Sequence, residues 1–434
     1  MNEMGHVAFY ISSLNKGGNE RVFINLALYL YERGYTITFV TTYLGMEEYY
    51  IPHASWKEIS ADEVSEQDRN VKQVLRQDER MVFVTKNDAL QEGEVAIGRY
   101  FTGFSSVDKD HGTSSTTAKR ARVLRLIWDK ILPDVIITSN SKNNIMALMS
   151  TVDSRYKVVV RSVGEPSLEY STRQTVLAMS TAFRRASGII LQTKKQEYFY
   201  PPAIRNKCVV LKNTIGQEFF REPYEGEREK VIVSVGTLTR NKNHHMLIKA
   251  FGRLKPTHPE WRLVIFGEGI ELKHLKTQVM GLGLRDSVYF PGNLDNIADR
   301  IYKAGAYVLS SEKEGIPSSL IEAMALGLPC VVTDCPCGGV VELVKDGVNG
   351  LVTPVNDAVR LEKTLLRVMD NPGFARSLGK AASDDIKRLY DYETINAEWE
   401  KYIRSIIDSA KRVEHDGIAA TIEAMDSQSS SKDF

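Results

Sequence analysis

Residues 314–322 combine two carboxylates with the features of an anion-binding loop. The segment EGIPSSLIE follows an apolar run at 306–309 and precedes a second apolar run that begins at Cys330. This order predicts strand, loop, helix and strand, and the loop after such a strand faces a ligand crevice. The start of the helix offers unpaired backbone N–H groups and the positive end of the helix dipole. The arrangement therefore favours a ligand that carries phosphate.

The residues inside this loop suit close contact with an anion. Gly315 lets a ligand approach the backbone, and Pro317 is tolerated where no N–H is needed. The hydroxyl groups of the next two residues can cap the helix or donate to phosphate oxygens. We therefore take the whole turn as ligand-binding: Gly315, Ile316, Pro317, Ser318 and Ser319.

The two carboxylates need another partner, because a bare negative charge repels a diphosphate. A carboxylate accepts two strong hydrogen bonds from a vicinal diol, so Glu314 can hold sugar hydroxyls and Glu322 the ribose. Ser319 and Glu322 also have the S-x-x-E spacing of a capping box, which explains both without any ligand. The spacing leaves both interpretations open for Glu322. Glu314 follows a strand end, where binding sites are usually located.

Two other loops also follow predicted strands. Gly17 and Gly18 lie between an apolar strand pattern at 6–12 and a helical pattern that Asn19 can cap, although an ordinary tight turn explains both glycines. Lys242 lies between the strand pattern that begins at Val231 and the next helix. An ammonium group at that position can neutralise diphosphate oxygens.

Length and composition narrow the class of protein. A chain of 434 residues exceeds what one hydrophobic core usually supports, so two domains are expected. The net charge of +1 provides no basic field for nucleic acid. The four cysteines lack the spacing of a zinc site, and reduced cytosolic thiols are expected. No apolar run approaches the roughly 18 residues of a membrane span, and the start of the chain does not resemble a signal peptide.

Strand and helix patterns alternate through both halves of the chain, which implies parallel sheets with right-handed crossovers. We expect a first domain over residues 1–213, in which the irregular region at about 60–118 suggests an insertion or an acceptor-specific subdomain. A charged linker at 213–229 leads to a second domain over 214–390. A helix at 391–412 and a disordered tail at 413–434 are expected to follow.

The Glu314-x7-Glu322 spacing, with EGIP inside it, resembles the signature of the retaining glycosyltransferases of family GT4, in glycosyltransferase group 1. The segment GGNERVFINLA from Gly17 resembles the opening of GT4 enzymes of capsule and glycan synthesis. The resemblance implies the GT-B architecture, an α/β fold with two doubly wound Rossmann-like domains that face a central crevice. It also implies that Gly17, Gly18, Gly267 and Glu268 lie near the donor or the acceptor.

The resemblance implies transfer of a hexosyl unit from a nucleoside diphosphate sugar, expected to be a UDP-sugar, to a hydroxyl of a glycan or lipid-linked glycan. Such transfer occurs in capsule, exopolysaccharide and cell-wall glycan synthesis. The donor would bind the second domain and the acceptor the first, with no metal ion and no cofactor. The expected location is the cytoplasm, with possible contact at the inner face of the membrane. Glu314, Lys242 and Arg240 are the expected catalytic residues.

The sequence departs from the family pattern at two positions. The family loop G-R-L-x-x-x-K has Thr237 in place of its arginine here, and we expect Arg240 to replace the missing charge at the diphosphate while Thr237 contacts the substrate. Many relatives carry a histidine in the segment that reads RSVGEP in this chain. Whether Arg161 or Glu165 takes its role is open.

Two other functions fit the same pattern. A catalytically silent partner subunit of a glycosyltransferase complex is favoured by the missing arginine and histidine, and a nucleotide-sugar epimerase shares the architecture but is disfavoured by the glutamate spacing. The basic amphipathic helix at 119–130 either packs on a sheet or touches anionic lipid.

Overall fold

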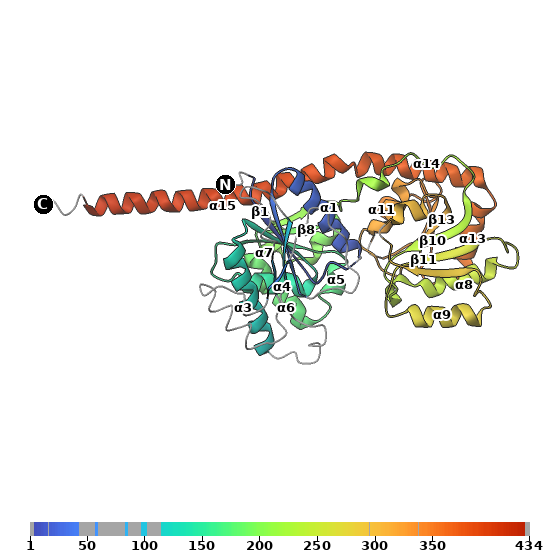
Figure 1. Ribbon diagram of the computed structural model, residues 1–434, viewed down its shortest axis with the longest axis horizontal. Coiled ribbons are helices and arrows are strands. Elements are labelled where there is room, and N and C mark those ends of the chain that lie inside the picture. Colours follow the sequence, from blue (N-terminus) through green and yellow to red (C-terminus); the bar gives the residue numbers. More distant parts are fainter. Residues whose placement is uncertain are drawn as a thin grey trace.

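The computed structural model describes residues 4–15, 17–42, 57–59, 83–85, 97–101, 114–294, 296–336 and 338–429. Two parallel sheets flanked by helices form two units joined side by side (Figure 1). The predicted α/β fold with two doubly wound domains is therefore confirmed. Most of the predicted insertion at about 60–118 lies outside the described residues.

The first sheet has seven strands in the order β5-β2-β1-β6-β7-β8-β9, and all neighbours are parallel. Its strands are β1 (His6–Ile11), β2 (Thr36–Thr41), β5 (Ile97–Phe101), β6 (Val135–Ser139), β7 (Lys157–Arg161), β8 (Gly188–Leu191) and β9 (Cys208–Val210). The helices of this half are α1 (Gly18–Glu32), α3 (Ser114–Ile131), α4 (Ser141–Ser150), α5 (Pro166–Glu169), α6 (Arg173–Ala182) and α7 (Pro202–Arg205). The short strands β3 (Lys57–Ile59) and β4 (Phe83–Thr85) pair antiparallel beside it.

The second sheet has six parallel strands in the order β12-β11-β10-β13-β14-β15. They are β10 (Glu229–Val235), β11 (Arg262–Phe266), β12 (Val288–Gly292), β13 (Ala304–Leu309), β14 (Cys330–Thr333) and β15 (Leu351–Thr353). The helices are α8 (His244–Leu254), α9 (Leu272–Gly281), α10 (Ile297–Ile301), α11 (Ser318–Ala325), α12 (Gly339–Leu343), α13 (Ala358–Met369), α14 (Pro372–Leu389) and α15 (Tyr392–Ser429). The 3-10 helices are η3 (Phe183–Arg185), η4 (Lys194–Phe199), η5 (Gln217–Phe219) and η6 (Arg240–Lys242).

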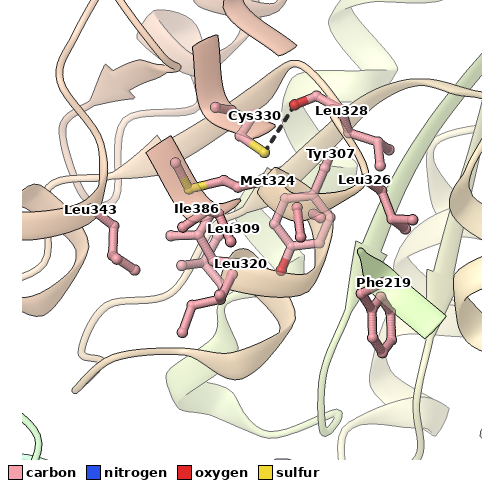
Figure 2. Close-up of a cluster of buried hydrophobic side chains, with 14 of the residues drawn as sticks. Phe219, Tyr307, Leu309, Leu320, Met324, Leu326, Leu328, Cys330, Leu343 and Ile386 are labelled. Atoms are coloured by element: carbon pink, nitrogen blue, oxygen red, sulfur yellow. Dashed lines mark hydrogen bonds between the residues drawn. The ribbon is translucent and has the colours of Figure 1, made fainter. Parts of the chain in front are cut away.

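Both faces of the central strands of each sheet are buried, which explains why these strands read as apolar runs rather than alternating patterns. In β1, Phe9 packs in a core with α1 and α15, whereas Tyr10 faces the core shared with α3 and α4. In the second domain, Tyr307 and Leu320 belong to the core between the sheet and helices α11 and α14 (Figure 2). Cys330 lies in the same core and donates to the carbonyl of Leu328 at 3.3 Å (Figure 2). These cores hold the carboxyl ends of β1 and β13, where the predicted ligand loops begin.

Helix α3 uses its apolar side for packing. Val123, Leu124, Ile127 and Trp128 are buried in the core of the first domain, and Trp128 donates to Ser150 at 2.8 Å. The structure thus agrees with the packing interpretation of this basic amphipathic helix. No helix among the described residues is both long and apolar enough to span a membrane.

The last two helices join the domains. Helix α14 packs on the second domain and α15 runs back along the first, then extends beyond it (Figure 1). Ile395, Trp399, Ile403 and Ile407, spaced by four residues, enter the core of the first domain. The expected helix end at 412 differs from the structure, in which α15 continues to Ser429. The segment that we expected to be disordered contains good helix formers and no proline up to that residue.

Trp399 is the deepest anchor of this returning helix, because its side chain is fully buried and its indole N–H donates to the Lys212 carbonyl at 2.7 Å. Trp399→Ala should lower the free energy of unfolding by about 3–5 kcal/mol, since it leaves a cavity. Trp399→Phe keeps most of the packing and should cost about 1 kcal/mol for the lost hydrogen bond. Scanning calorimetry measures both, and a wild-type melting temperature for Trp399→Ala would contradict the anchoring role.

Candidate functional site

Two helix starts face each other between the domains. Helix α1 begins after β1 and α11 begins after β13, and a Cβ atom added at Gly18 would lie 3.9 Å from Cβ of Ser318. Their N-cap residues are Gly17 and Pro317, and neither makes a side-chain cap hydrogen bond. The first N–H groups of both helices, together with their positive dipole ends, therefore point at one space.

This space is a cavity of about 130 Å³, which we call the central cavity. The two domains contribute to it through loops at the carboxyl ends of their strands, as expected for a doubly wound fold. It brings together nine residues that the sequence marked for binding or catalysis: Gly17, Gly18, Thr237, Lys242, Gly267, Pro317, Ser318, Ser319 and Glu322. The other lining residues are Arg21, Val235, Gly236, Phe266, Asn293, Leu294 and Ile297.

Glycine is required at 267, on the floor of this cavity. Its φ of 133° is unfavourable for residues with a side chain, and an added Cβ would lie 2.0 Å from the Gly236 carbonyl oxygen. The loops that follow β10 and β11 are therefore packed backbone to backbone. Neither glycine brings a side chain into the cavity.

Lys242 and Glu314 form an ion pair at the edge of the central cavity. Lys242 Nζ lies 2.5 Å from Glu314 Oε1, and the hydroxyl of Ser311 donates to the same oxygen at 2.6 Å. The two loops are also tied through backbone, because Glu312 N–H donates to the Asn241 carbonyl at 2.8 Å. The sequence placed both charged residues at strand ends, and the structure brings them into direct contact.

Glu314 also lines a second space, the lateral cavity, on the other side of this ion pair. The first domain contributes Val163, Gly164, Glu165 and Glu169, and the second contributes Asn241, Lys313, Glu314 and Gly315. Glu169 accepts from the N–H groups of Val163 and Gly164 at 2.9 and 2.7 Å. Burial raises the pKa of Glu169, and these hydrogen bonds oppose the shift. The Lys242–Glu314 pair thus separates two neighbouring cavities.

Glu322 does not form a capping box with Ser319. Helix α11 begins at Ser318, so Ser319 is already inside the first turn, where its hydroxyl accepts from Tyr307 at 2.9 Å. Glu322 is only 3% exposed. Its side chain accepts a hydrogen bond from Arg21 Nη1 of the other domain at 2.9 Å. Burial raises the pKa of Glu322, and the Arg21 guanidinium opposes that shift. The Glu322 carboxylate therefore lines the central cavity and does not cap helix α11.

The remaining predicted residues lie elsewhere. Arg240 is exposed and is absent from the lining of the central cavity. The structure thus does not bring Arg240 to the place expected of it, because the η6 turn directs Lys242 inward. Glu268 is also exposed and outside the lining. Ile316 is buried in the domain core, and Gly315 lines the lateral cavity rather than the central one.

A buried arginine holds the two domains at this site. Arg161 is fully buried and donates to Asn19 Oδ1 at 2.5 Å and to Asn213 Oδ1 at 2.6 Å. Asn213 donates in turn to the Ile316 carbonyl at 3.3 Å and to Ser318 Oγ at 3.4 Å. Burial lowers the pKa of Arg161 to about 10, which leaves it charged at neutral pH.

Sequence reasoning missed three of these roles. Asn19 was expected to cap α1, but Gly17 is the N-cap and Asn19 binds Arg161. Asn213 was treated only as part of a linker. Arg21 stands in the GGNER segment and points into the central cavity, and its place in the first turn of the helix was the signal available. Among the described residues, no group of three or more His, Cys, Asp or Glu side chains could hold a metal ion.

The pKa of Glu20 supplies a test of this region. Burial raises the pKa of Glu20 to about 7, although the positive charge of Arg161 favours the ionised carboxylate. In the unfolded chain the pKa has its ordinary value of 4.5. The folded protein therefore binds this proton more tightly, and the contribution of Glu20 to the free energy of unfolding falls as pH rises from about 4.5 to 7. Glu20→Gln removes this cost, so its advantage in free energy over wild type should grow over that range to at most about 3 kcal/mol.

Melting temperatures at pH 5, 6, 7 and 8 measure this difference. Glu32→Gln, at the exposed end of the same helix, is the control for the loss of a carboxylate from α1. A Glu20→Gln curve parallel to wild type over the whole range would contradict a raised pKa at Glu20.

Comparison with known proteins relates the second half of the chain to a family. Residues 216–385, from η5 through most of α14, match the family model described as glycosyl transferases group 1. The chain is 24% identical over 348 residues to the GalNAc-alpha-(1->4)-GalNAc-alpha-(1->3)-diNAcBac-PP-undecaprenol alpha-1,4-N-acetyl-D-galactosaminyltransferase of Campylobacter jejuni, which covers 76% of this chain and 95% of that protein. It is 27% identical to an exopolysaccharide phosphotransferase of Streptomyces coelicolor over 279 residues, and this match covers 63% of this chain.

The chain spans only part of several relatives: 29% of the Streptomyces protein, and 59% and 48% of two proteins named as uncharacterized glycosyltransferases. Among solved structures, Anabaena HepE in complex with UDP and glucose is 18% identical with a TM-score of 0.67, covering 92% of this chain and 100% of that chain. The sucrose-phosphate synthase of Thermosynechococcus elongatus is 16% identical with a TM-score of 0.71, covering 93% and 100%. The chain therefore has the GT-B fold, and residues 216–385 within its second domain match the glycosyl transferases group 1 family.

Proposed function

We propose that this chain is a retaining, metal-independent glycosyltransferase that moves a hexosyl unit from a UDP-sugar to a hydroxyl of a glycan or lipid-linked glycan. The observation that carries the proposal is the central cavity, where two helix starts and Lys242 face one space that ends at Glu322. A solved structure of the same fold, Anabaena HepE, has been determined with UDP-glucose, which supports this ligand class.

The nucleotide is held at the two ends of the central cavity. The diphosphate lies against the first N–H groups of α11, with the hydroxyl groups of Ser318 and Ser319 beside it. The ribose hydroxyls donate to Glu322, whose buried carboxylate is a strong acceptor. The backbone of Gly267 and Gly236 allows the base to lie close to the floor.

Lys242 supports the chemical step. Breaking the bond between sugar and diphosphate leaves extra negative charge on the diphosphate, and a preorganised ammonium stabilises that charge without reorganising water. The Lys242 side chain is 20% exposed and is held in place by Glu314. The remaining oxygen of Glu314 accepts from hydroxyls of the transferred sugar, so this carboxylate positions both the cation and the sugar.

The acceptor approaches from the lateral cavity. Retention requires the new bond to form on the face of the sugar from which the diphosphate leaves. The lateral cavity adjoins the central cavity at the Lys242–Glu314 pair, so a hydroxyl there can reach this face. The carboxylates of Glu165 and Glu169 provide acceptors for sugar hydroxyls in the same cavity.

Contact with anionic lipid would rely on the basic residues of α3, since its apolar side is buried.

Titration calorimetry with UDP, UMP and GDP in excess EDTA tests the nucleotide site. UDP should bind at least about tenfold more tightly than UMP, because the second phosphate reaches Lys242 and the helix starts. Lys242→Ala should remove most of this difference, whereas Lys249→Ala, an exposed lysine of α8, should keep it. Equal affinities for UDP and UMP, or UDP binding that disappears with EDTA, would contradict the metal-free diphosphate site.

Product analysis with UDP-sugars and oligosaccharide acceptors tests the reaction. Glu314→Gln should lower kcat by about a hundredfold, because it loosens both Lys242 and the sugar, while UDP affinity changes less. Glu342→Gln, an exposed carboxylate of α12, is the control. NMR of the product should show the anomeric configuration of the donor. A protein that binds UDP but forms no product with several donors and acceptors would instead be the silent partner subunit.

A further inference from the structure

The structure assigns Arg21 as the second cation of the donor site. It replaces the arginine that the second domain lacks at Thr237 and reaches the diphosphate from the opposite domain. This inference rests on the proposed function, since it concerns the same ligand. It differs from the sequence-based expectation, which gave the role to Arg240.

In the described part of the chain, two cationic side chains line the central cavity, those of Arg21 and Lys242. Arg21 stands in the first turn of α1 and its side chain is 17% exposed, close to the 20% of Lys242. The Phe219 ring lies under the guanidinium, with 5.8 Å from Cζ to the ring centroid. The side chain is thus held in place at the cavity, as a preorganised charge must be.

The ion pair between Arg21 and Glu322 is an exchangeable contact. A nucleoside diphosphate carries ribose hydroxyls for Glu322 and phosphate oxygens for Arg21, so it can replace both halves of the pair at once. Inorganic pyrophosphate offers a partner only for the arginine and would leave the buried carboxylate of Glu322 without its cation, which is costly. The pair therefore selects for ligands that contain ribose and diphosphate together.

An arginine of the first domain makes stabilisation of the diphosphate charge depend on domain closure, whereas an arginine at position 237 does not. Lys242 and residue 237 belong to the same domain, so a cation at 237 would act whether or not the crevice is closed. Arg21 acts only when the domains are together, as they are where Gly18 faces Ser318 and where Gly315 packs on the Val163 carbonyl. Charge stabilisation of the leaving diphosphate is thereby coupled to domain closure.

Arg21→Gln, Thr237→Arg and the double variant test this assignment. Glutamine can still donate to Glu322 but lacks the charge, so Arg21→Gln should weaken UDP binding at least about tenfold and lower kcat about a hundredfold. Pyrophosphate should bind wild type more weakly than UDP. The double variant should recover most of the lost UDP affinity, because an arginine at 237 restores the charge from the other side. Arg285→Ala, an exposed arginine of the second domain, should behave as wild type.

The outcomes separate this inference from the proposed function. Wild type that does not bind UDP overturns both. If wild type binds UDP and Arg21→Gln binds it equally well, the proposed function stands and the assignment of Arg21 is overturned. An affinity loss in Arg21→Gln that Thr237→Arg does not recover also overturns it, since Arg21 would then serve only as the partner of Glu322. Melting temperatures of all variants show whether each is folded.

Discussion

The buried guanidinium of Arg161 is the interaction on which the site depends. A charge inside a protein costs several kcal/mol unless hydrogen bonds and nearby opposite charges compensate it. Here the compensation comes from Asn19 in α1 and Asn213 in the connection between the sheets. Asn213 also holds the start of α11 through Ser318. One buried charge therefore fixes the positions of both helix starts that face the central cavity.

The contacts between the domains differ in kind at the two ends of the interface. At the cavity they are polar: Gln192 Oε1 accepts from Ile316 N–H at 3.0 Å, and Arg21 pairs with Glu322 at 2.9 Å. A hydrogen bond of neutral groups contributes only about 0.5–1.5 kcal/mol, because water can replace either partner. At the far end, the apolar face of α15 packs into the first domain. The polar contacts can be exchanged for water or a ligand while the apolar ones hold, which is the arrangement expected of a hinged crevice.

The chain crosses between the domains twice, and the two crossings lie together. Lys212 Nζ donates to the Leu389 carbonyl at 2.8 Å, and the Lys212 carbonyl accepts from Trp399. Arg21 and Lys242 belong to different domains, so a rotation about these crossings would change the distance between them.

The sequence by itself determined the two sheets, because buried parallel strands read as apolar runs and their helices as periodic ones. It also located the loops of Gly17, Lys242 and Glu314, since ligand loops follow the carboxyl ends of such strands. It could not decide whether Glu322 caps a helix or faces a ligand, because both need the same spacing. Only the tertiary structure excluded the capping role, by placing Arg21, 301 residues away in the sequence, against that carboxylate. The direction of Arg240 and the partner of Asn19 were likewise undetermined, since each depends on how distant segments pack and no local pattern records that packing.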